Sequence, residues 1–354
     1  MSENEDFSEK ALKIINKEYG NVSKSAKSFM EKKNIIVPVS PSTDIALNGG
    51  VPEGSWLVYN GKPKCGKTTS ALHFAKNCQK KEYGSKHIYF MNIEGRLKEM
   101  NLDGIEGLEK EKFTIIESEE ERILSAKDYL NIAEKLVYSH PGCVILFDSF
   151  SALCHEKELQ DGVGTSTRGG GAALLAQFCR QMANVVPVKK TIIIGITHLM
   201  ANTSGYGAAM QEKGGLGIAY QVDVKLRCKS TEPWDHNGKR VGQKVTWVAE
   251  TTALGGVPGS EFESWIRYGK GIDELKEIIV IGQDIGLIEK KGAYYYGTFM
   301  QNYLPVLGLT QWDDNAIKMT RSQGEDNFYN LLKDNPKWVN CLEKDISSIL
   351  GLKR

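Results

Sequence analysis

Short apolar runs separated by helical segments fill the chain from residue 35 to about residue 250. Runs so short and so uniformly apolar are typical of strands buried in a mostly parallel sheet. The runs are WLVY (56–59), HIYFMNI (87–93), FTII (113–116), CVILF (143–147), TIIIGIT (191–197), DVKLR (223–227) and VTWVA (245–249). Helical periodicity at residues 68–79, 123–138 and 171–186 predicts crossover helices. We therefore expect an α/β core, a mostly parallel sheet flanked by helices, whose later strands are antiparallel or at an edge.

The two ends of the chain show different patterns of apolar and polar residues. Residues 7–19 place apolar side chains among charges at helical spacing, and a basic stretch follows at 24–33. That stretch is either a solvated linker or an arm that packs on a neighbouring subunit. After Gly271 short helical and strand patterns alternate, and the last two helices are separated near Pro336. The expected parts are a short N-terminal helical segment with its linker at 1–34, the core at 35–271 and a small α+β C-terminal domain at 272–354.

Composition narrows the class of protein. The chain has 354 residues, of which 41% are apolar and 25% charged, and its formal net charge is +1. Nucleic-acid binders that rely on bulk electrostatics are usually more basic, so any DNA contact needs local clusters or backbone amides. Seven cysteines without close pairs favour reduced thiols over a disulfide framework or a zinc site. With no signal peptide and no membrane-length apolar run, we expect a cytoplasmic protein without a membrane partner.

The stretch GKPKCGKTT has the spacing of a phosphate-binding loop and lies between a predicted strand and a predicted helix. Loop amides and the helix N-terminus supply partial positive charge to a triphosphate. We expect Lys67 to reach the β- and γ-phosphates and Thr68 to hold Mg²⁺. The nucleotide-binding residues predicted from this stretch are Gly61, Lys62, Pro63, Lys64, Cys65, Gly66, Lys67, Thr68 and Thr69.

Three polar residues end neighbouring predicted strands, where ligands bind in open α/β folds. Asp148 follows five apolar residues and is expected in the Mg²⁺ shell, directly or through water. Glu94 could orient an attacking water. His198 could touch the γ-phosphate and report its presence. The plainer interpretations are a turn aspartate, an exposed strand-end glutamate and a hydrogen-bonded histidine.

Two long segments leave these strand ends. HEKELQDGVGTSTRGGGAA is rich in glycine, serine and threonine, and LMANTSGYGAAMQEKGGLG is rich in glycine with little charge. Both are long for loops of a compact domain, which favours a functional role. Glycine lets the backbone approach a ligand closely, and Arg168 and Arg180 could meet phosphates. A chain of nearly neutral charge could bind DNA in this way.

These motifs together resemble the RecA family of homologous recombinases, including the phage UvsX type. PSTDIALNGGVPEGSWLVYNGKPKCGKTT is similar to the opening of the family's core, IEGRL to the segment with the catalytic glutamate, and ILFDSFSAL to the second nucleotide motif. ITHLM resembles the sensor before the second DNA loop, where the family usually has glutamine and UvsX-like members have histidine. GLIEKKGAYYYG and NLLKDNP resemble phrases of the bacterial C-terminal domain. A phosphate-loop kinase or GTPase would share none of the last three phrases.

The resemblance implies a RecA-like P-loop ATPase that uses ATP and Mg²⁺, with Glu94 as general base, Lys67 on the phosphates and His198 as sensor. Its two DNA loops would be residues 156–168 and 199–215. The implied contacts to single-stranded DNA are Arg168, Gly169, Arg180, Gly214 and Gly215. The implied activity is homologous pairing and strand exchange by a helical filament on single-stranded DNA. The implied partners are single- and double-stranded DNA, further copies of the chain through the N-terminal helix, and single-strand-binding and loader proteins.

One departure from the family leaves alternatives open. The family places two basic residues after the VTWV-type strand to reach the neighbour's γ-phosphate, whereas this chain has VAETTALGG. Either another cation such as Lys244 or Arg267 acts there, or hydrolysis is weak; Lys62 or Lys64 is a further candidate cation. The second hypothesis is therefore a weakly hydrolysing RecA-like mediator. A hexameric helicase is the third, and the N-terminal helix and the C-terminal phrases argue against it.

Overall fold

The computed structural model describes residues 2–31, 34–161, 170–201, 210–213 and 216–352. Contacts divide the chain into residues 1–35 and residues 36–354. The first unit holds α1 (Ser2–Tyr19) and α2 (Ala26–Met30). Ser25 caps α2 by accepting a hydrogen bond from the amide of Ser28 at 3.1 Å. Apolar side chains of α1 such as Phe7, Ile14 and Tyr19 are exposed.

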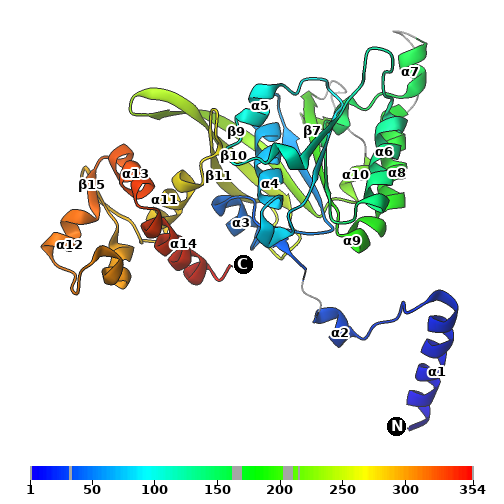
Figure 1. Ribbon diagram of the computed structural model, residues 1–354, viewed down its shortest axis with the longest axis horizontal. Helices are drawn as coiled ribbons and strands as arrows, with labels where there is room; N and C mark the ends of the chain where they lie inside the picture. Colours follow the sequence, from blue (N-terminus) through cyan, green and yellow to red (C-terminus); the bar gives the residue numbers. More distant parts are fainter. Residues whose placement is uncertain (1, 32–33, 162–169, 202–209, 214–215, 353–354) are drawn as a thin grey trace. The chain divides into compact units, whose positions relative to one another are not determined.

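A ten-stranded sheet forms the centre of the second unit (Figure 1). Its order is β12-β11-β10-β9-β3-β7-β6-β4-β5, and β8 pairs with β7 beside this path. Strands β3 to β7 are parallel where they pair, and β9 is parallel to β3 but antiparallel to β10. The strands are β3 (Trp56–Gly61), β4 (Ile88–Asn92), β5 (Phe113–Ile116), β6 (Val144–Asp148), β7 (Ile192–Ala201), β8 (Met210–Lys213), β9 (Val224–His236), β10 (Lys239–Thr251), β11 (Ser260–Arg267) and β12 (Gly271–Ile272).

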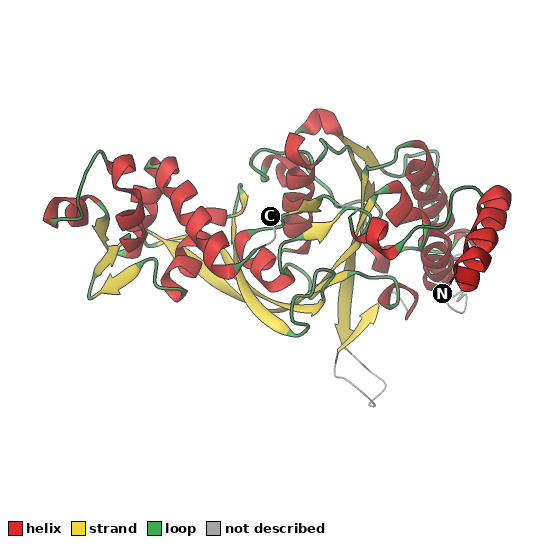
Figure 2. Cartoon of the chain, turned by 90° about the horizontal axis from the view of Figure 1, so that it is seen from below, coloured by secondary structure: helices red, strands yellow, loops and turns green. Residues whose placement is uncertain are grey.

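Helices cover both faces of this sheet (Figures 1 and 2). On one face α6, α8 and α9 pack on Trp56, Val58 and the inward residues of β6 and β7. Successive strand residues point to opposite faces, so Leu57 and Tyr59 face α4, which contacts β3, β6 and β7. The central strands are thus buried on both sides, which explains their uniformly apolar sequence. These helices are α4 (Lys67–Cys78), α6 (Ala126–Ser139), α8 (Gly170–Met182) and α9 (Val185–Lys189).

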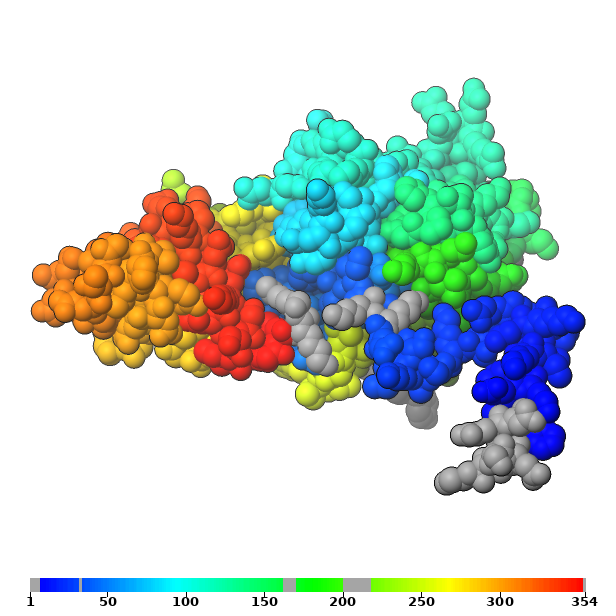
Figure 3. Space-filling model, turned by 60° about the horizontal axis from the view of Figure 1, so that its bottom comes forward, coloured from blue at the N-terminus to red at the C-terminus, as the bar shows by residue number. Residues whose placement is uncertain are grey.

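The C-terminal region has its own hydrophobic cluster, which includes Ile279, Phe299, Phe328 and Leu342. In Figure 3 the segment coloured orange to red forms a continuous lobe. A three-stranded antiparallel sheet lies within it. Its elements are α11 (Glu274–Asp284), β13 (Glu289–Lys291), β14 (Tyr294–Tyr296), the 3-10 segment Thr298–Leu307, α12 (Asp314–Met319), β15 (Arg321–Gln323), α13 (Glu325–Asp334) and α14 (Pro336–Leu350).

Short elements complete the unit. They are β1 (Ile36–Val37), α3 (Pro41–Leu47), β2 (Val51–Pro52), α5 (Glu99–Asp103), α7 (Glu156–Gln160), α10 (Leu216–Ala219) and the 3-10 turns Lys81–Tyr83, Lys110–Lys112 and Phe150–Ala152. Among the described helices, none combines the length and apolarity needed to cross a bilayer.

The α/β fold expected from the apolar pattern is confirmed, with two local corrections. The run at 223–227 is not simply an antiparallel or edge strand, because β9 pairs in parallel with β3 inside the sheet. The helix expected at 171–186 is two helices, since α8 ends at Met182 and α9 begins at Val185. Pro187 lacks the amide that would continue the hydrogen-bond ladder, so a single helix through this point is disfavoured.

Candidate nucleotide site at the strand ends

The phosphate loop (residues 61–66) connects the end of β3 to the start of α4. Gly66 precedes the first helical residue with φ of 88°, a left-handed conformation that glycine adopts without strain. A Cβ atom on Gly66 would lie 2.2 Å from Cδ1 of Ile266. The backbone angle therefore favours glycine here, and a Cβ atom would also have to displace the end of the Ile266 side chain on β11.

The ammonium group of Lys67 is folded back over the phosphate loop. Its Nζ donates to the carbonyl oxygens of Gly61 at 2.9 Å and Lys62 at 2.7 Å. The residue is only 5% exposed, and burial lowers its pKa. The cation is thus already positioned in the concavity of the loop, while Lys62, Pro63 and Lys64 are exposed at its rim.

Thr68 and Asp148 meet across the site. Thr68 Oγ1 donates to Asp148 Oδ2 at 2.9 Å. Burial raises the pKa of Asp148, and the hydrogen bond from Thr68 opposes that rise. No group of three or more His, Cys, Asp or Glu side chains that could hold a metal occurs in the described part of the chain. A hydroxyl and a carboxylate still fit Mg²⁺, which typically takes one or two protein carboxylates plus phosphate oxygens and waters.

The backbone fixes the ends of β4 and β6 together. Asn92 lies opposite Asp148 in the parallel ladder, and the amides of Ile93 and Glu94 donate to the Asp148 carbonyl at 3.0 and 3.1 Å. The peptide between Asp148 and Ser149 is cis. Glu94 therefore leaves its strand directly beside the predicted metal ligand.

The Glu94 carboxylate accepts hydrogen bonds from two side chains. Its Oε1 lies 2.7 Å from Nε2 of His198 and 2.6 Å from Oγ of Ser149. Its Oε2 lies 3.5 Å from Nη1 of Arg96. The hydrogen bond with His198 contributes most to lowering the pKa of Glu94 to about 2, with help from Ser149 and against the effect of burial. The group is a carboxylate at neutral pH.

His198 lies on β7, opposite Gly61 of β3 and opposite Lys213 of β8. Its amide donates to Ser151 Oγ at 2.9 Å, and its Nδ1 is buried without a hydrogen-bond partner among the described residues. A buried polar atom without a partner is costly and points to a missing ligand or a movable side chain. The strand that carries this histidine continues to Ala201 and pairs with β8, so residues 199–201 and 210–213 of the predicted second loop are strand rather than loop.

Two of the candidate replacement cations, Lys244 and Arg267, are already paired within the chain. Lys244 Nζ lies 3.1 Å from Glu232 and 2.8 Å from Glu263. Arg267 Nε lies 2.5 Å from Oδ2 of Asp273, and its guanidinium also stacks on an indole ring. Neither side chain projects as an unpaired cation.

The predicted DNA contacts are only partly placed. Arg168, Gly169, Gly214 and Gly215 lie outside the described residues. Arg180 is exposed in the last turn of α8, about 15 Å along the helix axis from its first residue.

Sequence reasoning missed the hydroxyl groups that organise the site. Ser149 binds Glu94, and Ser151 binds the His198 amide. Both belong to the phrase DSFS, which begins at Asp148, the last residue of its strand. Serines at alternate positions after a buried strand were the signal that could have identified them.

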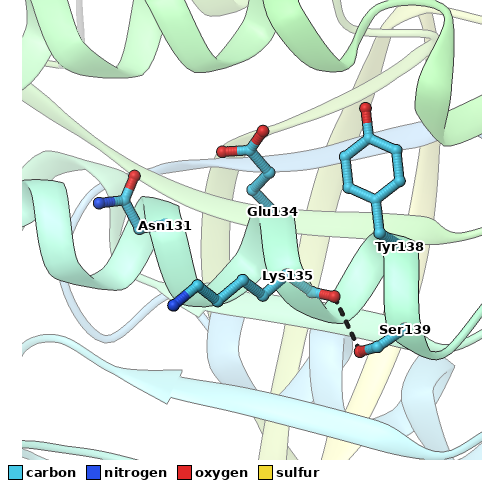
Figure 4. Close-up of a pocket in the computed structure, with 5 residues that line it drawn as sticks. All are labelled: Asn131, Glu134, Lys135, Tyr138 and Ser139. Atoms are coloured by element: carbon cyan, nitrogen blue, oxygen red, sulfur yellow. Dashed lines mark hydrogen bonds between the residues drawn. The ribbon is translucent and has the colours of Figure 1, made fainter.

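A separate cavity of about 630 Å³ lies on the outer face of α6 (Figure 4). Among the described residues, one helix supplies the lining, and Ser139 Oγ donates to the Lys135 carbonyl at its end. The described residues at the strand ends do not contribute, so this cavity is separate from the candidate nucleotide site. Its lining residues are Asn131, Glu134, Lys135, Tyr138 and Ser139.

Comparison with known proteins gives a consistent result. The family model described as the RecA N-terminal domain matches residues 7–273. Protein RecA of Oleidesulfovibrio alaskensis is 26% identical, with 97% of this chain and 91% of the relative covered. Protein RecA of Nocardioides sp. is 29% identical, and Protein RecA of Thermotoga maritima is 27% identical, with the same coverage.

Proposed function

Because this chain belongs to the RecA family, we propose that it is an ATP-dependent recombinase that assembles on single-stranded DNA and exchanges strands with a homologous duplex. The contact between Glu94 and His198 is the observation that carries this proposal. It joins the carboxylate best placed to orient water to the residue from which the second predicted DNA loop departs. A site of this kind can couple hydrolysis to the state of a DNA-binding segment.

In this proposal each residue of the site has one task. Amides of the phosphate loop and the Lys67 ammonium bind the phosphates, and Thr68 with Asp148 holds the metal ion. Mg²⁺, when bound, neutralises charge that develops on the phosphate oxygens. Glu94 orients the attacking water. With a pKa near 2 it is a weak base while His198 is bound to it.

His198 would act as the link between nucleotide and DNA. If its imidazole turns from Glu94 toward a phosphate, Glu94 loses its strongest stabilising partner and its pKa rises. The carboxylate then becomes a better base. The same movement would shift the start of residues 199–215, the segment that we propose is ordered by the γ-phosphate.

DNA would be held by residues 156–168 and 199–215 through backbone amides and a few arginines. Arg168, Gly169, Gly214 and Gly215 remain the proposed contacts within or next to these loops. Arg180 remains a proposed phosphate contact, at a different place on α8. Further copies of the chain would assemble through α1, whose exposed apolar side chains are available for packing on a neighbouring subunit.

Strand exchange between a circular single strand and a homologous linear duplex tests the proposal. We expect joint molecules with ATP and with a slowly hydrolysed analogue. The Glu94→Gln variant should form joint molecules without steady turnover. If neither nucleotide supports joint molecules, the recombinase assignment is wrong.

A weakly hydrolysing mediator is the second candidate. The pairing of Lys244 and Arg267 within the chain favours it, because a paired cation is less available to a neighbour's nucleotide. This alternative predicts DNA binding with little stimulation of ATPase activity by DNA. A turnover rate that is the same with and without single-stranded DNA would support it.

A further inference from the structure

Two cysteines from different parts of the chain meet at the phosphate loop. Cys65 lies within the loop and Cys228 on β9, and they are 4% and 7% exposed. A Cβ atom on Gly61 would lie 2.9 Å from Sγ of Cys65 and 2.8 Å from Cβ of Cys228. Both side chains therefore flank the same glycine. All seven cysteines of the chain are reduced in the structure.

The two thiols are chemically unequal. The adjacent Cys228 thiol is the main reason why the pKa of Cys65 lies below its ordinary value, and Lys67 adds to the effect. Lys67 Nζ lies 3.9 Å from Cys65 Sγ. The pKa of Cys228 is raised by the adjacent Cys65 and by burial, and its thiol donates to the Ser230 carbonyl at 3.8 Å. Cys65 thus has the character of an attacking thiolate, and Cys228 is a second thiol beside it that could complete a disulfide.

The other buried cysteines lack this environment. Burial raises the pKa of Cys78, Cys143 and Cys179, and these thiols lie in the hydrophobic core. Buried thiols of that kind are inert. We call Cys65 and Cys228 the thiol pair. Within the described residues, Cys65 combines a lowered pKa, a nearby ammonium group and an adjacent second thiol, that of Cys228.

We propose that the thiol pair is a modification site at which hydrogen peroxide forms a disulfide, and that this disulfide closes the phosphate loop to nucleotide. The second part rests on the proposed ATP site. The Cys65 sulfur attacks peroxide, gives a sulfenic acid and releases one water. The Cys228 sulfur then attacks the Cys65 sulfur, the S–S bond forms and a second water leaves. Two thiols lose two electrons, and one peroxide is reduced to two waters.

The geometry explains why the bond would act on nucleotide binding. A disulfide would tie the middle of the phosphate loop to β9, so the loop could no longer adjust its amides to a triphosphate. It would also remove the thiolate beside the Lys67 ammonium. Because Cys65 is nearly buried while Lys62 and Lys64 are exposed, a small oxidant suits the site. A bound triphosphate should cover the loop and protect Cys65.

The test uses the full chain treated with hydrogen peroxide, with and without prior MgATP. We expect mass spectrometry without reductant to find one peptide that links Cys65 to Cys228. The affinity for ATP should fall by about tenfold or more and recover with dithiothreitol. Prior MgATP should slow the cross-link. A cross-linked protein with unchanged ATP affinity would overturn the proposed closure, and the absence of the cross-linked peptide would overturn the site.

Two variants complete the test. Cys228→Ser should bind ATP normally when reduced, give no cross-link, and accumulate a Cys65 sulfenic acid that dimedone traps. Cys154→Ser, at a half-buried thiol outside the site, should keep the full peroxide response. A cross-link through other cysteines would contradict the proposal. If the untreated protein fails to bind ATP, the proposed nucleotide site fails, while the cross-link itself still tests the thiol pair.

Discussion

The Nε2 atom of His198 lies 2.7 Å from Oε1 of Glu94. This hydrogen bond joins His198, within β7, to Glu94, just beyond the end of β4, and β6 lies between these two strands in the sheet. It holds the pKa of the carboxyl group near 2. Removal of the histidine and removal of the glutamate should therefore have different effects, and both can be measured.

Substitution of the histidine should change the pH dependence of ATP turnover. In His198→Ala the pKa of Glu94 is expected to rise from about 2 toward its ordinary value of 4.5, because the largest stabilising hydrogen bond is lost. The acid limb of the pH profile should then move to higher pH. Turnover measured from pH 4.5 to pH 8 checks this. His140→Ala, at an exposed histidine beyond the end of α6, should leave the profile unchanged.

Substitution of the glutamate should separate binding from hydrolysis. Glu94→Gln should keep ATP binding but lower turnover by roughly 10²–10⁴-fold, the usual contribution of a general base. Equilibrium binding and single-turnover hydrolysis measure the two steps. Glu99→Gln, at an exposed residue of α5, is the matched control. Unchanged turnover in Glu94→Gln would count against the assigned role and support a mediator.

Gly66→Ala should lose ATP binding and stability. The left-handed angle alone costs about 1–2 kcal/mol for a residue with a Cβ, and the new atom also overlaps Ile266. Gly238→Ala has a similar φ of 69° with no atom within 4 Å, so it isolates the cost of the angle. Ile266→Val deletes Cδ1 and should partly rescue Gly66→Ala. Denaturant melts and ATP titrations check this for the parent, the two single glycine variants and the variant that combines Gly66→Ala with Ile266→Val. Equal losses of stability and ATP affinity in the two glycine variants would contradict the prediction.

Glu277 should make stability depend on pH. Complete burial raises its pKa to about 7, although hydrogen bonds from Ser264 and from the Ser42 amide oppose the rise. The folded state binds this proton more tightly than the unfolded chain does. The free energy of unfolding contributed by the group is therefore largest below about pH 4.5 and falls as the pH rises through 7.

Thermal melts of Glu277→Gln test this sign. A neutral amide can keep both hydrogen bonds without a buried charge, so the variant should melt higher than the parent at pH 8 and at a similar temperature at pH 5. Glu82→Gln, at an exposed residue, should show no such difference. A larger gain at pH 5 than at pH 8 would show that the sign is wrong.

Lys244→Ala should leave DNA-stimulated turnover unchanged, because its ammonium is held by Glu232 and Glu263. The half-exposed ion pairs should contribute no more than about 1 kcal/mol to stability. Lys67→Ala should abolish ATP binding and serves as the positive control. A large loss of turnover in Lys244→Ala, with filaments intact by electron microscopy, would identify Lys244 as the cation that acts across the subunit interface.

The sequence predicted the centre of the fold better than its margins. Strands β3, β4, β6 and β7 lie between helices, so burial on both faces leaves a run of apolar residues that is easily recognised. The length of the β9–β10 hairpin was underestimated from the sequence because its distal half is largely exposed and polar. Its turn, Asn237–Gly238, with positive φ at both residues, was the signal that could have shown it.

The candidate site divides in the same way. Glu94, Asp148 and His198 could be placed together from sequence because parallel strands bring their carboxyl ends to one edge. The choice of partners depends on distances across strands that no linear pattern contains. The Ser149 hydroxyl bound to Glu94 and the Cys228 thiol beside Gly61 are examples. Their functional roles, like those of the predicted DNA contacts, stay predictions.

The β9–β10 hairpin also sets a rule for how the protein can change in length. Cys228 near its base lies against the phosphate loop, whereas His236 at its tip lies 2.6 Å from Asp326 of α13. Since side chains alternate along a regular strand, loss of one residue from a regular part of this ladder would turn Trp234 from its buried position to the opposite face. Away from its register irregularities, the hairpin therefore keeps its buried face only when each strand loses two residues together, about 7 Å at a time.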